Sequence, residues 1–124
     1  MAWLQGWTYR KRHIIQRATG AGTGYQVLVK VYYGPGTDSG DSVYLNGRCR
    51  NDFGDIRFTR GDETTLLNYW METGNKVDSQ YAYFWVKIDD DLSVADVPIY
   101  IYYGNPSATT TSNGNNTFLF FDDF

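Results

Sequence analysis

The sequence predicts an all-β protein, an antiparallel β-sandwich of jelly-roll-like form, in one domain that covers residues 1–124. Three observations lead to this prediction. β-Branched and aromatic residues alternate with polar ones at a period of two along several segments, as in half-buried strands. The 13 glycines gather in short turns between these segments. A length of 124 residues with 42% apolar residues allows one hydrophobic core and leaves no room for a second.

The expected strands can be placed in order along the chain. They cover residues 7–17, 25–33, 55–59, 65–73, 80–88 and 98–103, and residues 117–121 are a candidate for a last one. In the second strand, Val27, Val29 and Val31 share one side. Lys30 shows on the other side, as a half-buried strand requires. Residues 108–116 are polar enough to form a long loop.

The third expected strand carries two charged residues at alternate positions. Its alternation buries Ile56 and Phe58 and places Asp55 and Arg57 on the opposite, exposed face. On that face the two charged side chains could hold a polar ligand between them. Alternatively, they could belong to a cross-strand ion pair.

Aromatic residues make up 18% of the chain, an excess that must either fill a core or cover a surface. Four alternate residues of strand 80–88 are expected to face the core: Ala82, Phe84, Val86 and Ile88. The rings of Tyr81, Tyr83 and Trp85 then share the other face, about 7 Å apart from a rise of roughly 3.3 Å per residue. The opposite assignment would bury these three rings beside Lys87, which would need a partner.

Two more strands are expected to add to this aromatic surface. Tyr100 and Tyr102 point outward from strand 98–103, and Trp70 shares one face of strand 65–73 with Glu72. Exposed rings flanked by charged side chains suit sugars, because the apolar C–H faces of a sugar stack on flat rings while its hydroxyl groups hydrogen-bond to polar neighbours. The same rings could instead complete a small core, with their polar tips at its rim.

The candidate carbohydrate-binding residues are Trp85, Tyr83, Tyr81, Trp70, Glu72, Asp55 and Arg57. The sequence predicts no catalytic residue, because a glycosidase needs two carboxylates about 5 to 10 Å apart across a cleft, and a domain of this size offers little depth for one. His13 lies in a basic strand without metal-ligand partners and is expected to be solvated. The acidic run at residues 89–91 could bind Ca²⁺ but is more typical of a solvated turn, so no cofactor is predicted.

Composition excludes several further classes of function. The net charge of −3 argues against general nucleic-acid binding. The single cysteine, Cys49, allows neither an internal disulfide nor a thiolate metal cluster. No apolar run approaches the roughly 18 residues of a membrane span, so no membrane insertion is expected.

Six motifs follow one another along the chain: Gly6-Trp7-x-Tyr9-Arg10, Asp55-Ile56-Arg57-Phe58-Thr59, Tyr69-Trp70-Met71-Glu72, Trp85-Val86-Lys87-Ile88, Ile99-Tyr100-Ile101-Tyr102-Tyr103-Gly104-Asn105 and Phe120-Phe121-Asp122-Asp123-Phe124. In content and order they resemble the DUF2341 family of domains of unknown function. The resemblance implies a place in large exported surface proteins of archaea and bacteria, often directly before a concanavalin A-like lectin domain. Members often carry an Asp-x-Asp-Gly-type turn where this chain has residues 60–64, so a cation site in that turn is in doubt here.

We therefore expect a non-catalytic polysaccharide-binding module, located extracellularly or at the cell surface, in an exported surface protein or a secreted glycoside hydrolase. Its expected partners are a polysaccharide and neighbouring domains of the parent chain. The abrupt apolar end at residues 118–124 favours a domain excised from a larger multidomain protein. The alternative is a structural or adhesion spacer whose exposed aromatic residues pack against a neighbouring domain.

Overall fold

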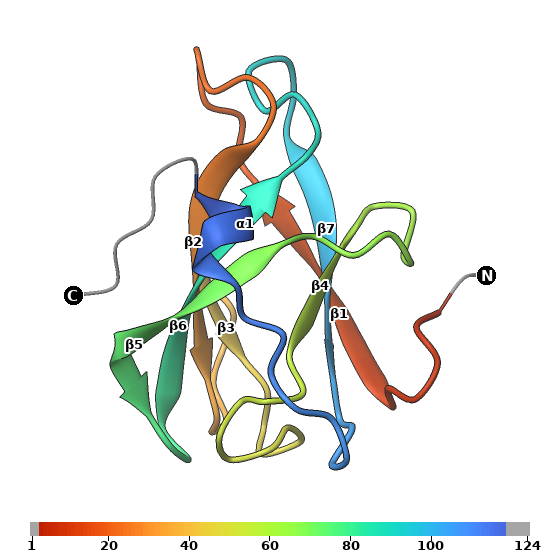
Figure 1. Ribbon diagram of the computed structural model, residues 1–124, viewed down its shortest axis with the longest axis vertical. Coiled ribbons are helices and arrows are strands. Elements are labelled where there is room, and N and C mark those ends of the chain that lie inside the picture. Colours follow the sequence, from red (N-terminus) through yellow and green to blue (C-terminus); the bar gives the residue numbers. More distant parts are fainter. Residues whose placement is uncertain (1–2, 119–124) are drawn as a thin grey trace.

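The structure is a computed structural model that describes residues 3–118, and it consists of two packed β-sheets (Figure 1). The elements are β1 (Tyr9–Ile15), β2 (Tyr25–Tyr32), β3 (Ser42–Tyr44), β4 (Arg57–Arg60), β5 (Tyr69–Val77), β6 (Tyr81–Ile88), β7 (Val97–Tyr103) and α1 (Gly114–Thr117). One sheet has the strand order β1-β7-β4 and the other has β3-β2-β6-β5. The predicted β-sandwich is confirmed, and its strand pairs are antiparallel apart from one, β2 with β3. Within residues 3–118, no helix is long and apolar enough to cross a membrane.

The six strands expected from the sequence are present, with ends that differ by a few residues. Neighbouring strands are antiparallel except β2 and β3, which run parallel. Two elements were not expected, the three-residue β3 and the single turn of α1. In the candidate strand at residues 117–121, Thr117 is helical, because it is the last residue of α1. Residues 119–121 lie outside the described part of the chain.

The core lies between the two sheets and is built by the inward side of each strand. The expected alternation in β6 is confirmed, because Ala82, Phe84, Val86 and Ile88 are fully buried. Phe58 of β4 meets Phe84 of the other sheet edge to face, with ring centroids 5.4 Å apart. Tyr69 of β5 completes the cluster at 5.5 Å from Phe58 and 5.6 Å from Phe84. Such ring pairs stabilise a core beyond the area they bury.

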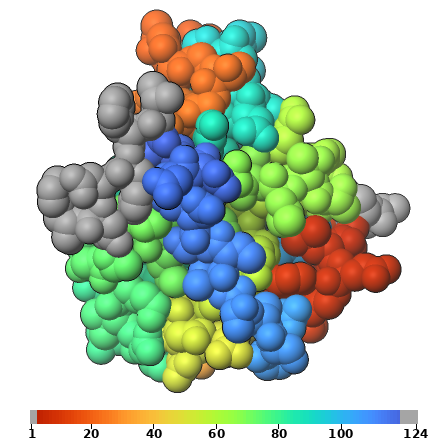
Figure 2. Space-filling view, in the orientation of Figure 1, coloured from red at the N-terminus to blue at the C-terminus, as the bar shows by residue number. Residues whose placement is uncertain are grey.

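The free edge of β5 is covered by the chain that follows β7. Ser112 accepts a hydrogen bond from the Met71 amide through its hydroxyl at 2.7 Å, and the Asn113 amide donates to the Tyr69 carbonyl at 2.8 Å. The expected loop at residues 108–116 is thus a loop as far as Asn113, whose side chain then caps α1. Figure 2 shows this segment, in blue, lying against the green surface of β5. Covering an edge strand in this way removes a site for uncontrolled strand pairing.

Candidate functional site

The outward side of the four-stranded sheet carries a row of four tyrosines, which we call the tyrosine band: Tyr44, Tyr32, Tyr81 and Tyr83. The rings of Tyr44 and Tyr32 are stacked, with centroids 4.8 Å apart. Tyr81 follows at 6.5 Å from Tyr32, and Tyr83 at 5.5 Å from Tyr81. The band therefore crosses three strands without a break.

Strand alternation and register place the band. Tyr32 is paired with Tyr44 of β3 on one side and with Tyr81 of β6 on the other, so the three rings lie in one row across the sheet. Gly36 makes room for the Tyr44 ring at the end of the row, because a Cβ at position 36 would lie 2.5 Å from that ring. A side chain there would displace the ring from its stack on Tyr32.

All four rings of the tyrosine band are half-buried, so each keeps part of its surface in contact with solvent. Lys30, the register partner of Tyr83, places its ammonium group 5.4 Å from the centre of that ring. This distance is within the range of a cation–π interaction. The band thus combines exposed apolar ring surface with a positive charge.

A second group on the same face, which we call the tryptophan cluster, consists of Trp70, Trp85, Phe118 and Glu72. Trp70 and Trp85 are register partners on β5 and β6. Phe118 meets both indoles at steep angles, with centroids 6.0 and 6.2 Å away. The Trp85 indole N–H donates to Glu72 at 3.0 Å, and Asn75 donates to the other carboxylate oxygen. The two indoles are therefore packed against Phe118, and one of them is hydrogen-bonded to Glu72.

The structure brings five of the seven candidate residues together on this outward face: Tyr81, Tyr83, Trp85, Trp70 and Glu72. Sequence reasoning missed Tyr32, Tyr44 and Phe118 as members of the surface. The signal for Tyr32 was present, because it lies on the same side of its strand as Lys30. Tyr44 belongs to a strand too short to be recognised from its pattern.

Asp55 does not lie on this face, and the expectation that it is exposed is wrong, because it is fully buried. One carboxylate oxygen accepts a hydrogen bond from the Arg50 amide at 3.0 Å. The other accepts from the amides of Gly104 at 2.9 Å and Asn105 at 3.0 Å. Gly104 has φ +85° and lies so close to Tyr9 that a Cβ would clash with that ring at 2.5 Å. Asp55 therefore anchors two loops and cannot reach a ligand.

Arg57 is also buried, with 8% of its surface exposed, so its predicted exposure is wrong as well. Its guanidinium donates to the carbonyls of Gly54 at 3.0 Å, Ile56 at 2.9 Å and Thr109 at 2.6 Å. The ring of Trp7 covers it at 5.2 Å. Within residues 3–118, the ion pairs include neither Asp55 nor Arg57, so the cross-strand pair considered for them does not form there.

The outward side of the three-stranded sheet is closed in the same manner. Tyr102, expected to be an exposed ring, is fully buried. Its hydroxyl donates to the Glu63 carbonyl at 2.5 Å and accepts from Arg10 at 3.0 Å. Trp3 covers the pair, with its ring 4.1 Å from the Arg10 guanidinium and 5.7 Å from the Tyr102 ring. Tyr100, the other expected outward ring, is half-buried at 4.9 Å from Arg10.

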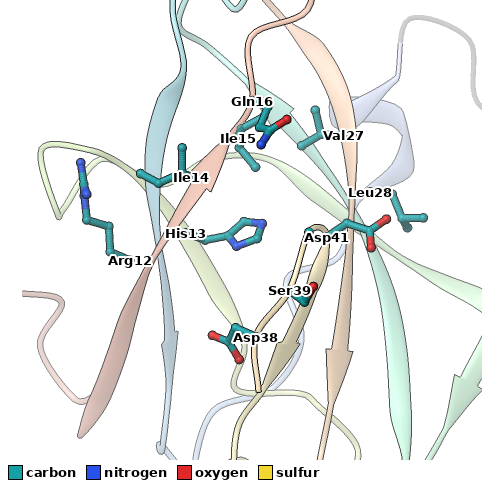
Figure 3. Close-up of a pocket in the computed structure, with 11 residues that line it drawn as sticks. Arg12, His13, Ile14, Ile15, Gln16, Val27, Leu28, Asp38, Ser39 and Asp41 are labelled. Carbon is teal, nitrogen blue, oxygen red and sulfur yellow. The ribbon is translucent and has the colours of Figure 1, made fainter. Parts of the chain in front are cut away.

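His13 is buried, with 9% of its surface exposed, so the expectation of a solvated histidine is wrong. Figure 3 shows its ring pointing from β1 into a groove of about 710 Å³ that Val27, Asp38 and Asp41 also line. Burial lowers the pKa of His13, against the opposing effect of the carboxylates of Asp38 and Asp41. Within the described residues, no group of three or more His, Cys, Asp or Glu side chains could hold a metal ion.

The structure also shows the surroundings of the acidic run at residues 89–91 and of Cys49, both considered from the sequence. In the acidic run, Asp90 pairs with Arg60 at 2.5 Å, and Asp91 accepts hydrogen bonds from the amide and hydroxyl of Ser93. The run thus stabilises a turn. Cys49 is buried, and burial raises the pKa of its thiol to about 12, so the thiol is protonated at neutral pH.

Comparison with known proteins gives a family but no function. A family model described as Domain of unknown function (DUF2341) matches residues 52–124, more than half of the chain. The match spans the motifs from Asp55 to Phe124 and begins after the one at residues 6–10. No curated protein and no solved structure matches the chain significantly.

Proposed function

The chain belongs to the DUF2341 family, and we propose that it binds a polysaccharide, without catalysis, on the outward face of the four-stranded sheet. One observation carries this proposal: the tyrosine band is a continuous row of half-buried rings on one face of a sheet. Sites built on strands hold their geometry better than sites built on loops. A row of rings suits a chain of sugar units, each of which offers an apolar face.

The neighbouring polar groups support this proposal. Lys30 lies beside Tyr83, and the hydroxyl groups of the tyrosines can both donate and accept hydrogen bonds. A binding site for a polar ligand combines apolar surface with a few placed polar groups, and the face provides both. Of the residues predicted from the sequence, Tyr81 and Tyr83 have the central role in this proposal. Trp85, Trp70 and Glu72 form the flank of the site.

We also propose an extracellular or cell-surface setting in a larger parent protein, either an exported surface protein or a secreted glycoside hydrolase. This part rests on the resemblance to the family. In such a setting the module would keep its parent protein close to a polysaccharide.

The test is affinity electrophoresis of the domain in gels that contain soluble polysaccharides, with Tyr81→Ala and Tyr83→Ala as variants. We expect at least one polysaccharide to retard the wild-type domain and both variants to migrate faster in it. Tyr100→Ala is the matched control, because it removes a half-buried tyrosine from the opposite sheet. Absence of retardation across neutral and acidic polymers would contradict the proposal.

A second candidate function is a structural or adhesion spacer whose aromatic face packs against a neighbouring domain. The tryptophan cluster favours it, because Phe118 already uses the faces of Trp70 and Trp85 for packing. A docking face leaves the isolated domain prone to self-association, since large apolar patches rarely stay unpaired. Size-exclusion chromatography over a range of concentrations distinguishes the two functions. A concentration-dependent dimer that Tyr83→Ala abolishes would favour the spacer.

A further inference from the structure

We infer that the polysaccharide bound by this face is anionic, with carboxylate or sulfate groups that Lys30 and Lys87 neutralise. The inference rests on the proposed function and adds the class of ligand. It follows from the charges that the four-stranded sheet presents outward and from the partners of those charges.

The outward charges of this sheet do not balance one another. Alternation places Lys30 of β2 and Lys87 of β6 on the outward side, together with one acid of β5, Glu72. Glu72 is occupied by the Trp85 indole and by Asn75. Among residues 3–118, no acid lies within ion-pair distance of Lys30 or Lys87. Both hydrogen-bond partners of Glu72 are neutral, so Glu72 keeps its charge. Two lysines and one acid still leave a net positive charge on the outward side of these strands.

The two lysines are spaced along the aromatic surface. Lys30 is paired in register with Tyr83. Lys87 lies four residues beyond Tyr83 on β6, which places it roughly 13 Å from Tyr83 along the strand at about 3.3 Å per residue. Lys87 also lines a polar groove of about 600 Å³ with Gln26, Asn116 and Asp89. One cation thus lies over the tyrosine band and the other beyond Trp85. A polymer that runs along β6, over Tyr83 and past Trp85, would pass both.

The overall charge of the chain does not oppose this inference. The net charge is −3, but charges more than about 8 to 10 Å apart are largely screened at physiological salt. Apart from Glu72 on this face and Asp89 in the groove of Lys87, acids farther away than this act weakly on a polymer held against the face. Lysine suits an anionic polymer because its ammonium is a compact charge on a flexible stem, able to follow anionic groups that vary in position.

The test compares two double variants by affinity electrophoresis in polygalacturonate, dextran sulfate and neutral dextran at low and high salt. K30Q/K87Q removes the two cations of the face. R12Q/R17Q is its matched control, because it removes the same number of cations, both of them exposed: Arg12 of β1, in the other sheet, and Arg17, two residues after β1 ends. Melting curves check that each variant is folded.

We expect the wild type and R12Q/R17Q to bind one of the two acidic polymers, and K30Q/K87Q to bind it about tenfold more weakly at low salt. The acidic polymer that binds identifies the anionic group as carboxylate or sulfate. Equal weakening by both double variants would overturn the inference, since it would show a general effect of net charge. Binding of neutral dextran that K30Q/K87Q leaves intact would overturn the inference and leave the proposed function standing. If none of the three polymers binds, both fall.

Discussion

The two sheets of this sandwich differ in how far the chain covers their outward aromatic residues. On the three-stranded sheet, Tyr102 is fully buried under Arg10 and Trp3, and its hydroxyl has hydrogen-bond partners within the chain. On the four-stranded sheet, Tyr81 and Tyr83 are only half-buried. Both faces arise from the same alternation of residues along strands. What differs is whether another segment of the chain lies over them.

The difference shows what it takes to close an aromatic face. Arg10 covers Tyr102 at the cost of bringing its own charge under Trp3, and the ion pair with Glu63 at 3.1 Å compensates that charge. On the open face, Lys30 lies over Tyr83 with no acid of residues 3–118 within ion-pair distance. The closed face is thus a small core of its own, whereas the open face keeps its groups available.

The comparison is tested most strongly by Tyr102→Ala. We expect this substitution to lower the free energy of unfolding by about 3–5 kcal/mol, the cost of removing a fully buried aromatic ring. Urea unfolding followed by tryptophan fluorescence measures it. Tyr102→Phe keeps the ring and loses the hydroxyl, so it should cost less, about 1–2 kcal/mol. A loss below 1 kcal/mol for the alanine variant would mean that the face is not closed.

The tryptophan cluster lies on the open face but is partly covered by Phe118. The loss of stability in Trp85→Ala should therefore fall between those of Tyr102→Ala and Tyr83→Ala. We expect a loss of about 2 kcal/mol, from the ring contact with Phe118 and the hydrogen bond to Glu72. Trp85→Phe retains a ring and should recover about half of this. The same urea unfolding measures both variants. A cost equal to that of Tyr102→Ala would place Trp85 in the core, and a cost near zero would place it with the tyrosine band.

The sequence predicts the sandwich and its strands because the period of two is carried by many residues at once. A single misread residue does not change that pattern, and the burial of Phe84 and Val86 follows from it directly. The short strand β3 could not be predicted in the same way. Its three residues contain only one buried position, Val43, and its parallel pairing with β2 depends on contacts distant in sequence.

The site was predictable in part, because alternation says which side of a strand a residue is on but not what covers that side. The alternation predicts that Tyr83 and Tyr102 both point outward, but Trp3 covers Tyr102 and does not cover Tyr83. The same limit explains the buried Arg57, which Trp7 covers. The covering residues come from the first few positions of the chain, and no local pattern shows where such a segment lies.

The acid stability of the fold should depend on His13, which lies on the inward side of the strand that carries Arg10. Burial lowers the pKa of His13 below its ordinary 6.5. The unfolded chain therefore takes up a proton at a higher pH than the folded one. Stability should be constant above about pH 6.5 and should fall as the pH drops from there towards the lowered pKa. Urea unfolding between pH 7.5 and 5 measures this slope.

His13→Gln is the control for that pH dependence, because glutamine does not titrate. The slope between pH 6.5 and 5 should be absent in the variant, whatever its stability at pH 7.5. Aspartates with lowered pKa, such as Asp52 and Asp62, lose their stabilising effect only below their ordinary 3.8, outside this window. An unchanged slope would show that His13 is not the group responsible.

The smallest expected effect on stability belongs to Tyr83→Ala on the open face, and it is the most informative about function. Tyr83 is half-buried, and its ring contacts are with Tyr81 and Lys30. Losing such surface pairs costs about 1 kcal/mol or less.

A ring that stacks on a sugar should contribute about 1–3 kcal/mol to binding, by analogy with stacking on a nucleic-acid base. Affinity should thus fall by roughly fivefold to a hundredfold while the urea midpoint barely moves. That separation distinguishes a binding face from a packing face, because a packing ring loses stability and binding together. If Tyr83→Ala unfolds the domain as readily as Tyr102→Ala does, the two faces are alike and the contrast between them is wrong.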